Sequence, residues 1–385
     1  KTKLFWSFLL LGTTTLLPFN SIIIPVDFWI KYYEPYIMSA ISLTDNIFNW
    51  VFSIVMLLVG RKFNQKAILY GALIVWVFSL ISIPILNFIS QTQLKTFLTF
   101  LLVGLCSMQN AFFFPTLLNL AGSQTHAIVT GQGLAGLFPQ LILILLKTFN
   151  LGDLIFQSTL FFAVAVCVVG FSFIPARFVL KTLQQRNYVQ INEILPQKSS
   201  KLFKKQIVSE LTVFITLFVT MSSFPAVTVH INCIWLIKRQ QPLSDWWNVG
   251  MMSTFILLDF VGRSVSVFLK RFFDMKTLLI IAFLRILLVI MFLLEAIPVF
   301  DCLTEDGKTY CSGEGPIIQS DFVAIMTLVV FALSNGLTFS LVMMKFDQNV
   351  DQADLQKVGV LQALTINTGL LCGGAVSMAL EILFQ

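Results

Sequence analysis

The chain carries long apolar runs from one end to the other, and each is long enough to cross a lipid bilayer. A helix rises about 1.5 Å per residue, so about 20 apolar residues span the hydrocarbon core. Such runs lie at 4–24, 36–60, 67–90, 97–121, 128–147, 154–175, 205–228, 245–268, 275–297, 321–343 and 357–383. These eleven runs predict an all-α integral membrane protein with eleven transmembrane helices. The run at 36–60 also contains Asp45, Asn46 and Asn49, so ten helices is the alternative.

The composition supports a membrane protein and argues against a nucleic-acid partner. Of the 385 residues, 57% are hydrophobic and 11% are charged, whereas soluble proteins are about 45–50% apolar and about 25% charged. Lipid must therefore be the solvent for much of the surface. The net charge of +6 comes from basic residues between apolar runs and not from a basic stripe on a soluble domain. We expect a lipid bilayer and no nucleic acid as the environment of this chain.

The distribution of basic residues predicts the orientation of the chain. Seventeen of the 25 Lys and Arg fall on the side of the N-terminus, six fall on the other side, and Arg263 and Arg285 fall inside runs. The positive-inside rule then predicts a cytoplasmic N-terminus and an extracellular or lumenal C-terminus. A plasma membrane and a vacuolar or lysosomal-type membrane both fit. Because the chain begins at Lys1 and no cleavage pattern follows the first run, we expect missing N-terminal residues and a first span that is not a signal peptide.

A polar, basic segment divides the runs into two groups. It lies at 176–204, after the sixth run. The sequence therefore predicts an N-terminal six-helix bundle at 1–175, a cytoplasmic linker at 176–204 and a C-terminal five-helix bundle at 205–385. Such linkers commonly join bundles whose relative rocking gives alternating access to a central site. The alternative is a solvated tether without a further role.

The sequence contains no pattern for catalysis, for a cofactor or for a metal ion. The two histidines, His126 and His230, lie far apart, and no His/Cys/Asp/Glu cluster has metal-ligand spacing. No phosphate-binding Gly loop and no nucleophile–base motif occurs. We therefore expect neither an enzyme nor an ATP-driven pump.

Asp259 and Arg263 are the most informative residues inside an apolar run. A charged side chain at the bilayer centre costs about 2.5–3.5 kcal/mol on insertion scales, so each one requires an explanation. Four residues apart on a helix, the two lie on one face and neutralise each other. Their spare acceptors and donors suit an uncharged, hydroxyl-rich solute. The alternative is a structural ion pair that holds this helix against a neighbour.

Other polar and aromatic residues within the runs are weaker candidates. The amide of Gln109 complements an amide-like edge of a heterocyclic base, or it forms a helix–helix hydrogen bond. Phe19 follows Pro18 and could stack on a base or pack within the protein. Asp45 suggests proton coupling, or it is hydrogen-bonded to a neighbouring Asn in the interior. Arg285 has no partner nearby in the sequence, so it could reach a carboxylate on another span or extend to the membrane surface.

Two cysteines share the hydrophilic segment 299–320, which the predicted topology places outside the cytoplasm. Cys302 and Cys311 lie nine residues apart and could form a disulfide in an oxidising compartment. Cys233 is a competing partner.

Six strings, in the same order along most of the chain, resemble one family. They are LGTTTLLPFN in the first run, TGQGLAGLF in the fifth, FPAVTVHI in the seventh, LLDFVGRS in the eighth, FALSNG in the tenth and GLLCGGAVSM in the eleventh. Each string is similar to the corresponding motif of the equilibrative nucleoside transporters, solute carrier family 29. The long loop after the sixth run also falls where that family has its large cytoplasmic loop.

The resemblance implies a fold related to the major facilitator architecture, with six- and five-helix bundles around a central site. Asp259 and Arg263 match the carboxylate and arginine that the family associates with ribose. Gln109 aligns with a glutamine that contacts the base, and Phe19 stands where many members have Trp. Phe224, followed by Pro225, matches a Phe-Pro pair that lines or shapes the cavity.

The resemblance also implies a function. We expect facilitative transport of nucleosides such as adenosine and uridine by alternating access, with one chain sufficient for a pathway. The alternatives are a proton-coupled nucleoside or nucleobase carrier, an organic-cation carrier of the same fold, and a receptor or structural membrane protein without transport.

Overall fold

The computed structural model describes most of the chain as two compact units. The described residues are 2–33, 37–60, 63–121, 124–149, 153–187, 199–224, 227–241, 245–297, 301–305, 308–312, 315–346 and 355–381. The first unit comprises Lys1–Glu210 and Met343–Thr368, and the second comprises Leu211–Val342 and Gly369–Gln385. The predicted boundaries at 1–175, 176–204 and 205–385 stay a prediction.

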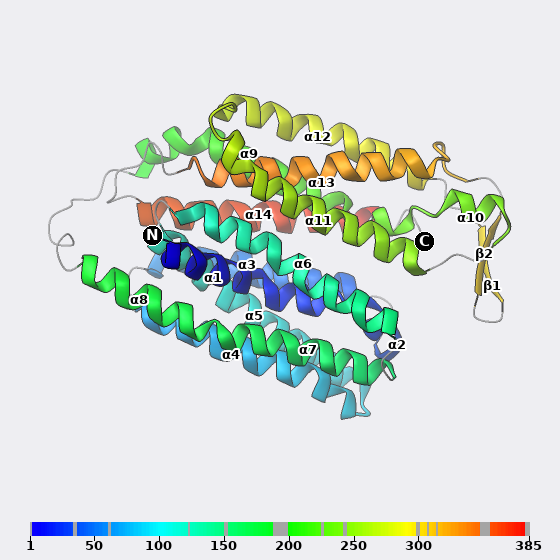
Figure 1. Ribbon diagram of the computed structural model, residues 1–385, viewed down its shortest axis with the longest axis horizontal. Coiled ribbons are helices and arrows are strands. Elements are labelled where there is room, and N and C mark those ends of the chain that lie inside the picture. Colours follow the sequence, from blue (N-terminus) through cyan, green and yellow to red (C-terminus); the bar gives the residue numbers. More distant parts are fainter. Residues whose placement is uncertain are drawn as a thin grey trace. The chain divides into compact units, whose positions relative to one another are not determined.

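Helices form almost all of the regular structure (Figure 1). The elements that belong to the first unit alone are α1 (Thr2–Ile23), α2 (Val26–Tyr32), α3 (Ile37–Val59), α4 (Gln65–Ile85), η2 (Leu86–Phe88), α5 (Thr92–Ala121), α6 (Thr125–Phe149), α7 (Leu154–Phe171) and α8 (Phe173–Asn187). The remaining elements are α9 (Ser199–Ser223), η4 (Thr228–His230), α10 (Ile234–Lys238), α11 (Asp245–Leu269), α12 (Met275–Ala296), β1 (Asp301–Glu305), β2 (Lys308–Ser312), α13 (Asp321–Met343) and α14 (Leu355–Glu381). Helices α9 and α14 each contribute residues to both units, and the last residue of α13, Met343, belongs to the first unit.

Eleven helices within the described residues are long and apolar enough to cross a membrane. The predicted fold class, an all-α membrane protein with eleven transmembrane helices, is confirmed, including the polar second span at Ala40–Val59. One feature was not predicted. Strands β1 and β2 form an antiparallel hairpin in the hydrophilic segment 299–320, where the sequence shows no apolar alternation that would indicate strands.

Several helices begin at a side chain that caps the first turn. Asn64 accepts a hydrogen bond from the backbone of Lys66 at the start of α4, and Asp153 accepts one from Phe156 at the start of α7. Asp274 accepts from the backbone and the hydroxyl of Thr277 at the start of α12, and these hydrogen bonds lower the pKa of its carboxyl group. Such caps satisfy backbone N–H groups that the helix itself leaves unpaired.

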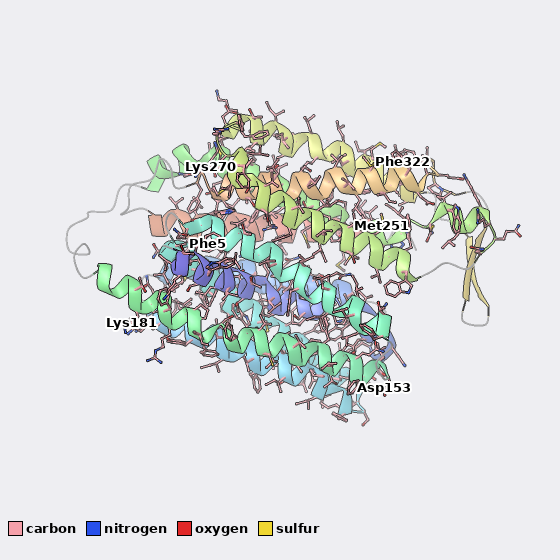
Figure 2. All side chains as sticks on the ribbon, viewed as in Figure 1. Phe5, Asp153, Lys181, Met251, Lys270 and Phe322 are labelled. Carbon is pink, nitrogen blue, oxygen red and sulfur yellow. The ribbon has the colours of Figure 1, made fainter. Side chains whose placement is uncertain are left out.

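Several charged residues lie at the ends of helices, and apolar side chains cover most of the length between them. In the first unit, Figure 2 shows Asp153 and Lys181 at opposite ends of the α7–α8 segment. In the second unit, Lys270 follows the end of α11 and Phe322 lies near the start of α13. This pattern suits helices whose middle sections contact lipid.

Glycines bring α1 and α6 together in the first unit. A Cβ atom at Gly12 would lie 2.3 Å from the carbonyl oxygen of Ile128, so the two backbones are in direct contact. Gln132, on α6, donates a hydrogen bond to Thr15, on α1, at 3.4 Å. The motifs LGTTTLLPFN and TGQGLAGLF therefore form one helix crossing, built from the small residues that membrane helices use for close packing.

Glycines and a hydrophobic cluster organise the second unit. Gly373, on α14, faces the backbone of Phe218, on α9, and a Cβ atom there would lie 2.6 Å from the carbonyl oxygen. The GLLCGGAVSM string thus provides a flat surface for helix packing. Helices α9, α11, α12 and α13 also contribute large buried side chains to one cluster, among them Phe255, Phe292 and Phe331.

Candidate functional site

Asp259 and Arg263 form an ion pair along one face of α11. Nε of Arg263 lies 2.7 Å from Oδ2 of Asp259. Both residues are buried: Asp259 is 8% exposed and Arg263 is 7% exposed. Residues four apart in a helix lie on the same face, so the two charges meet as the sequence predicts. Their role in substrate binding stays a prediction.

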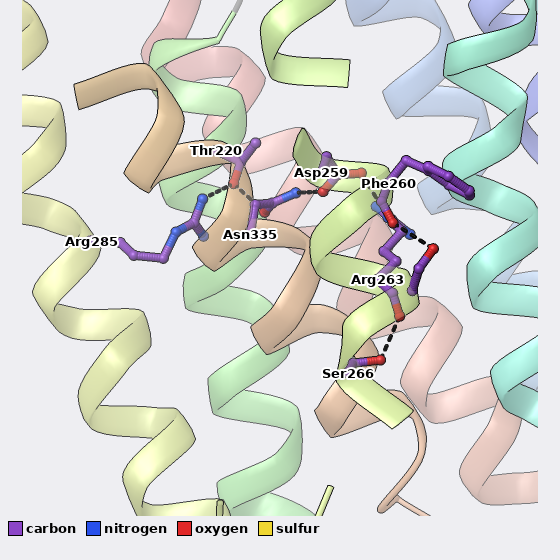
Figure 3. Close-up of polar contacts among 8 residues, drawn as sticks. Thr220, Asp259, Phe260, Arg263, Ser266, Arg285 and Asn335 are labelled. Atoms are coloured by element: carbon purple, nitrogen blue, oxygen red, sulfur yellow. Dashed lines mark hydrogen bonds and ion pairs between the residues drawn. The ribbon is translucent and has the colours of Figure 1, made fainter. Parts of the chain in front are cut away.

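A neighbouring helix supplies a further partner for the carboxylate. Nδ2 of Asn335, on α13, donates to Oδ1 of Asp259 at 2.7 Å. Oδ1 of Asn335 accepts from the hydroxyl of Thr220, on α9, also at 2.7 Å. Figure 3 shows this line of side chains from α9 through α13 to α11. The ion pair is therefore one end of a longer polar chain.

Close contact between α11 and α13 makes this arrangement possible. A Cβ atom at Gly262 would lie 2.5 Å from the carbonyl oxygen of Leu333, and Gly336 packs in the same way against the backbone of Asp259. Only a residue without a side chain fits at these positions. The strings LLDFVGRS and FALSNG, far apart in the sequence, thus meet at one crossing.

Arg285, on α12, forms the other end of the polar chain. Its side chain is buried, with 1% of the residue exposed. Nη2 donates to the hydroxyl of Thr220 at 2.7 Å, and Nη1 donates to the carbonyl oxygen of Thr216 at 2.8 Å. Nε donates to the hydroxyl of Ser334 at 3.2 Å. The guanidinium also lies 4.6 Å from the ring centroid of Phe331. Arg285 is therefore buried and does not extend to the membrane surface. It forms no direct ion pair with a carboxylate among the described residues, but it interacts electrostatically with Asp259, on α11, to which Thr220 and Asn335 connect it.

The ion pair retains unused hydrogen-bonding capacity. Nη1 of Arg263 is buried and has no hydrogen-bond partner among the described residues. The guanidinium packs against the ring of Phe339, with 4.8 Å between its carbon and the ring centroid. Each carboxylate oxygen of Asp259 accepts one hydrogen bond from the described residues and has one further lone-pair site. This arrangement offers a donor to an oxygen atom and acceptors to hydroxyl groups of a polar solute.

Phe224 directly follows the last residue of α9, Ser223, and belongs to the hydrophobic cluster of the second unit. Its ring stacks on that of Phe255, with 3.7 Å between centroids and an interplanar angle of 16°. The side chain is 9% exposed. Pro225, which shares its predicted role, lies outside the described residues.

Gln109 and Phe19 both lie in the first unit. Gln109 is in the middle of α5 and is partly exposed, while its neighbour Asn110 donates to Oδ1 of Asn49, on α3, at 3.2 Å. Phe19 is partly exposed on α1, directly after Pro18, and the helix continues through the proline to Ile23. The contribution of both residues to substrate binding stays a prediction.

Asp45 belongs to a buried polar cluster between α3 and α5. Its Oδ1 accepts from the hydroxyl of Ser107 at 2.5 Å, and its backbone carbonyl accepts from Nδ2 of Asn49 at 3.1 Å. Asn367, on α14, extends the cluster by donating to Ser53 at 2.7 Å. The expected location in the interior, next to Asn49, agrees with the structure.

The structure identifies no metal-binding cluster of three or more His, Cys, Asp or Glu among the residues that it describes. In the β1–β2 hairpin, Cys302 and Cys311 are direct partners in the register. Cys233, the competing partner for a disulfide, is a free thiol that donates to Asp321 at 3.7 Å. The Cys302–Cys311 disulfide stays a prediction.

Sequence reasoning did not identify the residues that surround the ion pair. Asn335 and Thr220 are single polar residues in apolar spans, a signal that also fits an isolated helix–helix hydrogen bond. Asn335 lies inside the FALSNG string, but no pattern in the sequence connects that string to Arg285. The association of the ion pair with Thr220, Asn335 and Arg285 requires the packing of four helices, α9, α11, α12 and α13.

Comparison with known proteins identifies the family and supports the fold. Residues 97–382 match the profile of the family described as nucleoside transporter. Human equilibrative nucleoside transporter 2 is 28% identical over 196 residues, which cover 49% of this chain and 40% of that relative. The aligned part thus spans less than half the length of this relative.

Solved structures show the same fold at low sequence identity. A bacterial homologue of the iron transporter ferroportin, in an outward-facing state, has a TM-score of 0.64 at 10% identity and covers 100% of this chain and 98% of that chain. The major facilitator superfamily proton:xylose symporter XylE has a TM-score of 0.61 at 9% identity, with 99% and 95% of the two chains covered. The protein is a multi-pass integral membrane protein with a transporter fold, and its homologues and structural neighbours are transporters and not enzymes. On the profile match over residues 97–382, the chain belongs to the nucleoside transporter family, that of the equilibrative nucleoside transporters.

Proposed function

We propose that the protein is a facilitative carrier that moves nucleosides across a membrane by alternating access. The family, the name of the human relative and the transporter fold support this proposal. The sequence contains no nucleotide-binding loop that would supply energy from ATP. Net flux therefore follows the concentration gradient of the nucleoside, and one chain is sufficient for the pathway.

Asp259 and Arg263 bind the ribose. The observation that carries this assignment is the buried Nη1 of Arg263, which has no hydrogen-bond partner among the described residues. A ribose oxygen accepts from this group, and the free lone pairs of Asp259 accept from ribose hydroxyls. An unpaired buried donor is costly, so a solute that supplies an acceptor is bound selectively over one that lacks it.

Gln109 binds the edge of the base, and Phe19 provides an aromatic surface for it. The primary amide offers one donor and one acceptor, which match the amide-like edges of purines and pyrimidines. Phe224 lines or shapes the cavity, and its ring stacks on that of Phe255 in the hydrophobic cluster of the second unit. We infer that hydrogen bonding to Gln109 sets the preference for a base. Stacking on an aromatic ring does not distinguish the bases, since every base has a π face.

The N-terminus is cytoplasmic and the C-terminus is extracellular or lumenal in this proposal. The excess of Lys and Arg on the N-terminal side supports the orientation. In a background without the six native cysteines, a single Cys introduced at Lys181, at the C-terminal end of the sixth span, is expected to react with impermeant maleimide only after the cell is permeabilised. Labelling of intact cells at this position would reverse the proposed orientation.

Uptake of labelled adenosine and uridine into proteoliposomes tests the proposed function. The full chain is expected to equilibrate both nucleosides without accumulating them. Asp259→Asn and Arg263→Gln are expected to raise KM about tenfold or more, because each removes a hydrogen bond to a charged group. Lys270→Gln, which changes a charge just beyond the same helix, is the matched control and retains wild-type KM. Wild-type KM in both site variants contradicts the ribose assignment.

Two rival functions predict different results in the same assay. A proton-coupled carrier accumulates nucleoside above equilibrium when a pH gradient is imposed, and buried Asp45 is its candidate proton-binding group. We expect the same equilibrium endpoint with and without the gradient, in the wild-type protein and in Asp45→Asn. An organic-cation carrier is distinguished by strong competition from tetraalkylammonium ions, which the proposed ribose site does not favour.

A further inference from the structure

Arg285 is a buried cation that donates three hydrogen bonds within the described part of the chain, all of them to uncharged oxygens. These are the carbonyl oxygen of Thr216 and the hydroxyls of Thr220 and Ser334. A positive charge in the middle of a membrane helix is costly without a carboxylate beside it. The cost indicates a role beyond filling space, because an uncharged side chain of similar size would pack in hydrocarbon more readily.

The hydrogen-bonding chemistry at the two ends fixes the direction of the polar chain. The guanidinium of Arg285 can only donate, and the carboxylate of Asp259 can only accept. Thr220 must therefore present a lone pair to Arg285, and Asn335 must present its NH₂ group to Asp259. These constraints leave the Thr220 hydroxyl as donor and the Asn335 carbonyl as acceptor, in agreement with the observed pairs.

Thr220 has a second acceptor within reach, and Arg285 decides between the two. The hydroxyl lies 2.8 Å from the carbonyl oxygen of Thr216 and 2.7 Å from Oδ1 of Asn335, but it has only one proton to donate. Nη1 of Arg285 already donates to the Thr216 carbonyl at 2.8 Å. Because the Thr216 carbonyl already accepts a hydrogen bond from Arg285, the Thr220 hydroxyl can donate its proton to Asn335 instead.

We propose that Arg285 is a positioning residue that sets the selectivity for ribose hydroxyls through Thr220 and Asn335, without itself contacting the solute. The inference rests on the proposed function, since it acts on the ribose site. With its amide fixed, Asn335 holds one carboxylate oxygen of Asp259 while Arg263 holds the other. The carboxylate is then oriented before the solute arrives, and its remaining lone pairs point in a defined direction.

Thr220→Val is the sharpest test, because it keeps the shape of the side chain and removes the hydroxyl. Arg285→Met would remove three hydrogen bonds from a buried position and is expected to impair folding. The readout is the ratio of the inhibition constants of 2′,3′-dideoxyadenosine and adenosine against labelled uridine uptake. This ratio reports recognition of the ribose hydroxyls and is insensitive to a uniform loss of flux.

The proposal predicts a fall in this ratio of about tenfold in Thr220→Val, the scale of a lost hydrogen bond to a charged group. Thr220→Ser restores the hydroxyl and is expected to restore the ratio. Ser222→Ala is the matched control: it removes a buried hydroxyl from the same helix that donates only to its own helix at 2.9 Å, and it leaves the ratio unchanged.

Asp259→Asn separates failure of this inference from failure of the proposed function. If Asp259→Asn lowers the ratio but Thr220→Val leaves it at the wild-type value, the positioning role of Arg285 is overturned and the ribose site stands. If neither variant changes the ratio while uptake persists, the ribose site itself is wrong and the inference falls with it.

Discussion

Gly336, on α13, lies directly against the backbone of Asp259, on α11. A Cβ atom at position 336 would fall 2.0 Å from the carbonyl oxygen of Asp259, far inside van der Waals contact. The residue just before Gly336, Asn335, donates a hydrogen bond to the carboxylate of Asp259. The backbone contact between the two helices therefore sets the geometry of the buried ion pair.

Gly336→Ala is expected to separate α11 from α13 and to destabilise the second unit. Forcing a methyl group into packed backbone costs about 1–3 kcal/mol or more. Gly250→Ala is the matched control, because Gly250 lies on α11 and a Cβ atom added there would have no neighbouring atom within 4 Å. Thermal unfolding of the purified protein in detergent checks both variants, and an unchanged midpoint in Gly336→Ala would contradict the close contact.

Gly131→Ala is expected to have the corresponding effect on the first unit. A Cβ atom at Gly131, on α6, would lie 2.1 Å from the carbonyl oxygen of Leu9, on α1. Gly131, the first of the three glycines of the TGQGLAGLF string, is thus a packing residue, and its replacement should lower the unfolding midpoint. Gly71→Ala, on α4, is the control with open space around the new methyl group. Equal midpoints for the two variants would argue against the α1–α6 crossing.

Loss of one partner of the ion pair should be more harmful to stability than loss of both charges. Arg263→Met leaves the Asp259 carboxylate buried without its cation, which typically costs about 3–5 kcal/mol. The double variant Asp259→Asn/Arg263→Met removes the stranded charge, while the new amide can still accept from Asn335. The double variant is therefore expected to unfold at a higher temperature than Arg263→Met. The reverse order would show that solvent reaches the carboxylate.

Cys302 and Cys311 are expected to form a disulfide across the β1–β2 hairpin. They are direct partners in the antiparallel register, and such pairs have Cα atoms about 4.5–5.5 Å apart, within the range that a disulfide requires. Mass spectrometry of peptides from the unreduced protein should recover the two cysteines joined, both in the wild type and in Cys233→Ser. Free thiols at both positions in protein from an oxidising compartment would exclude the bond.

Much of the fold could be predicted from the sequence because each span is a local property. A run of about 20 apolar residues must form a helix in lipid, since the helix alone satisfies its backbone groups within the segment. The ion pair could also be predicted, because Asp259 and Arg263 meet within one helical turn. The short helices α2 and α10 and the β1–β2 hairpin were missed, as their residues follow no long periodic pattern.

The segments that enter the membrane and the two charges that share a helix face can be recognised from the order of the amino acids, because hydropathy and helical periodicity act over neighbouring residues. The hydrogen bonds of Arg285 to Thr216, Thr220 and Ser334, and the connection through Thr220 and Asn335 to Asp259, depend on the packing of the helices. Those contacts connect helices separated by many residues, so they depend on which helices cross and how closely. Glycines at the crossings set that distance, and a one-dimensional pattern does not reveal which surfaces meet.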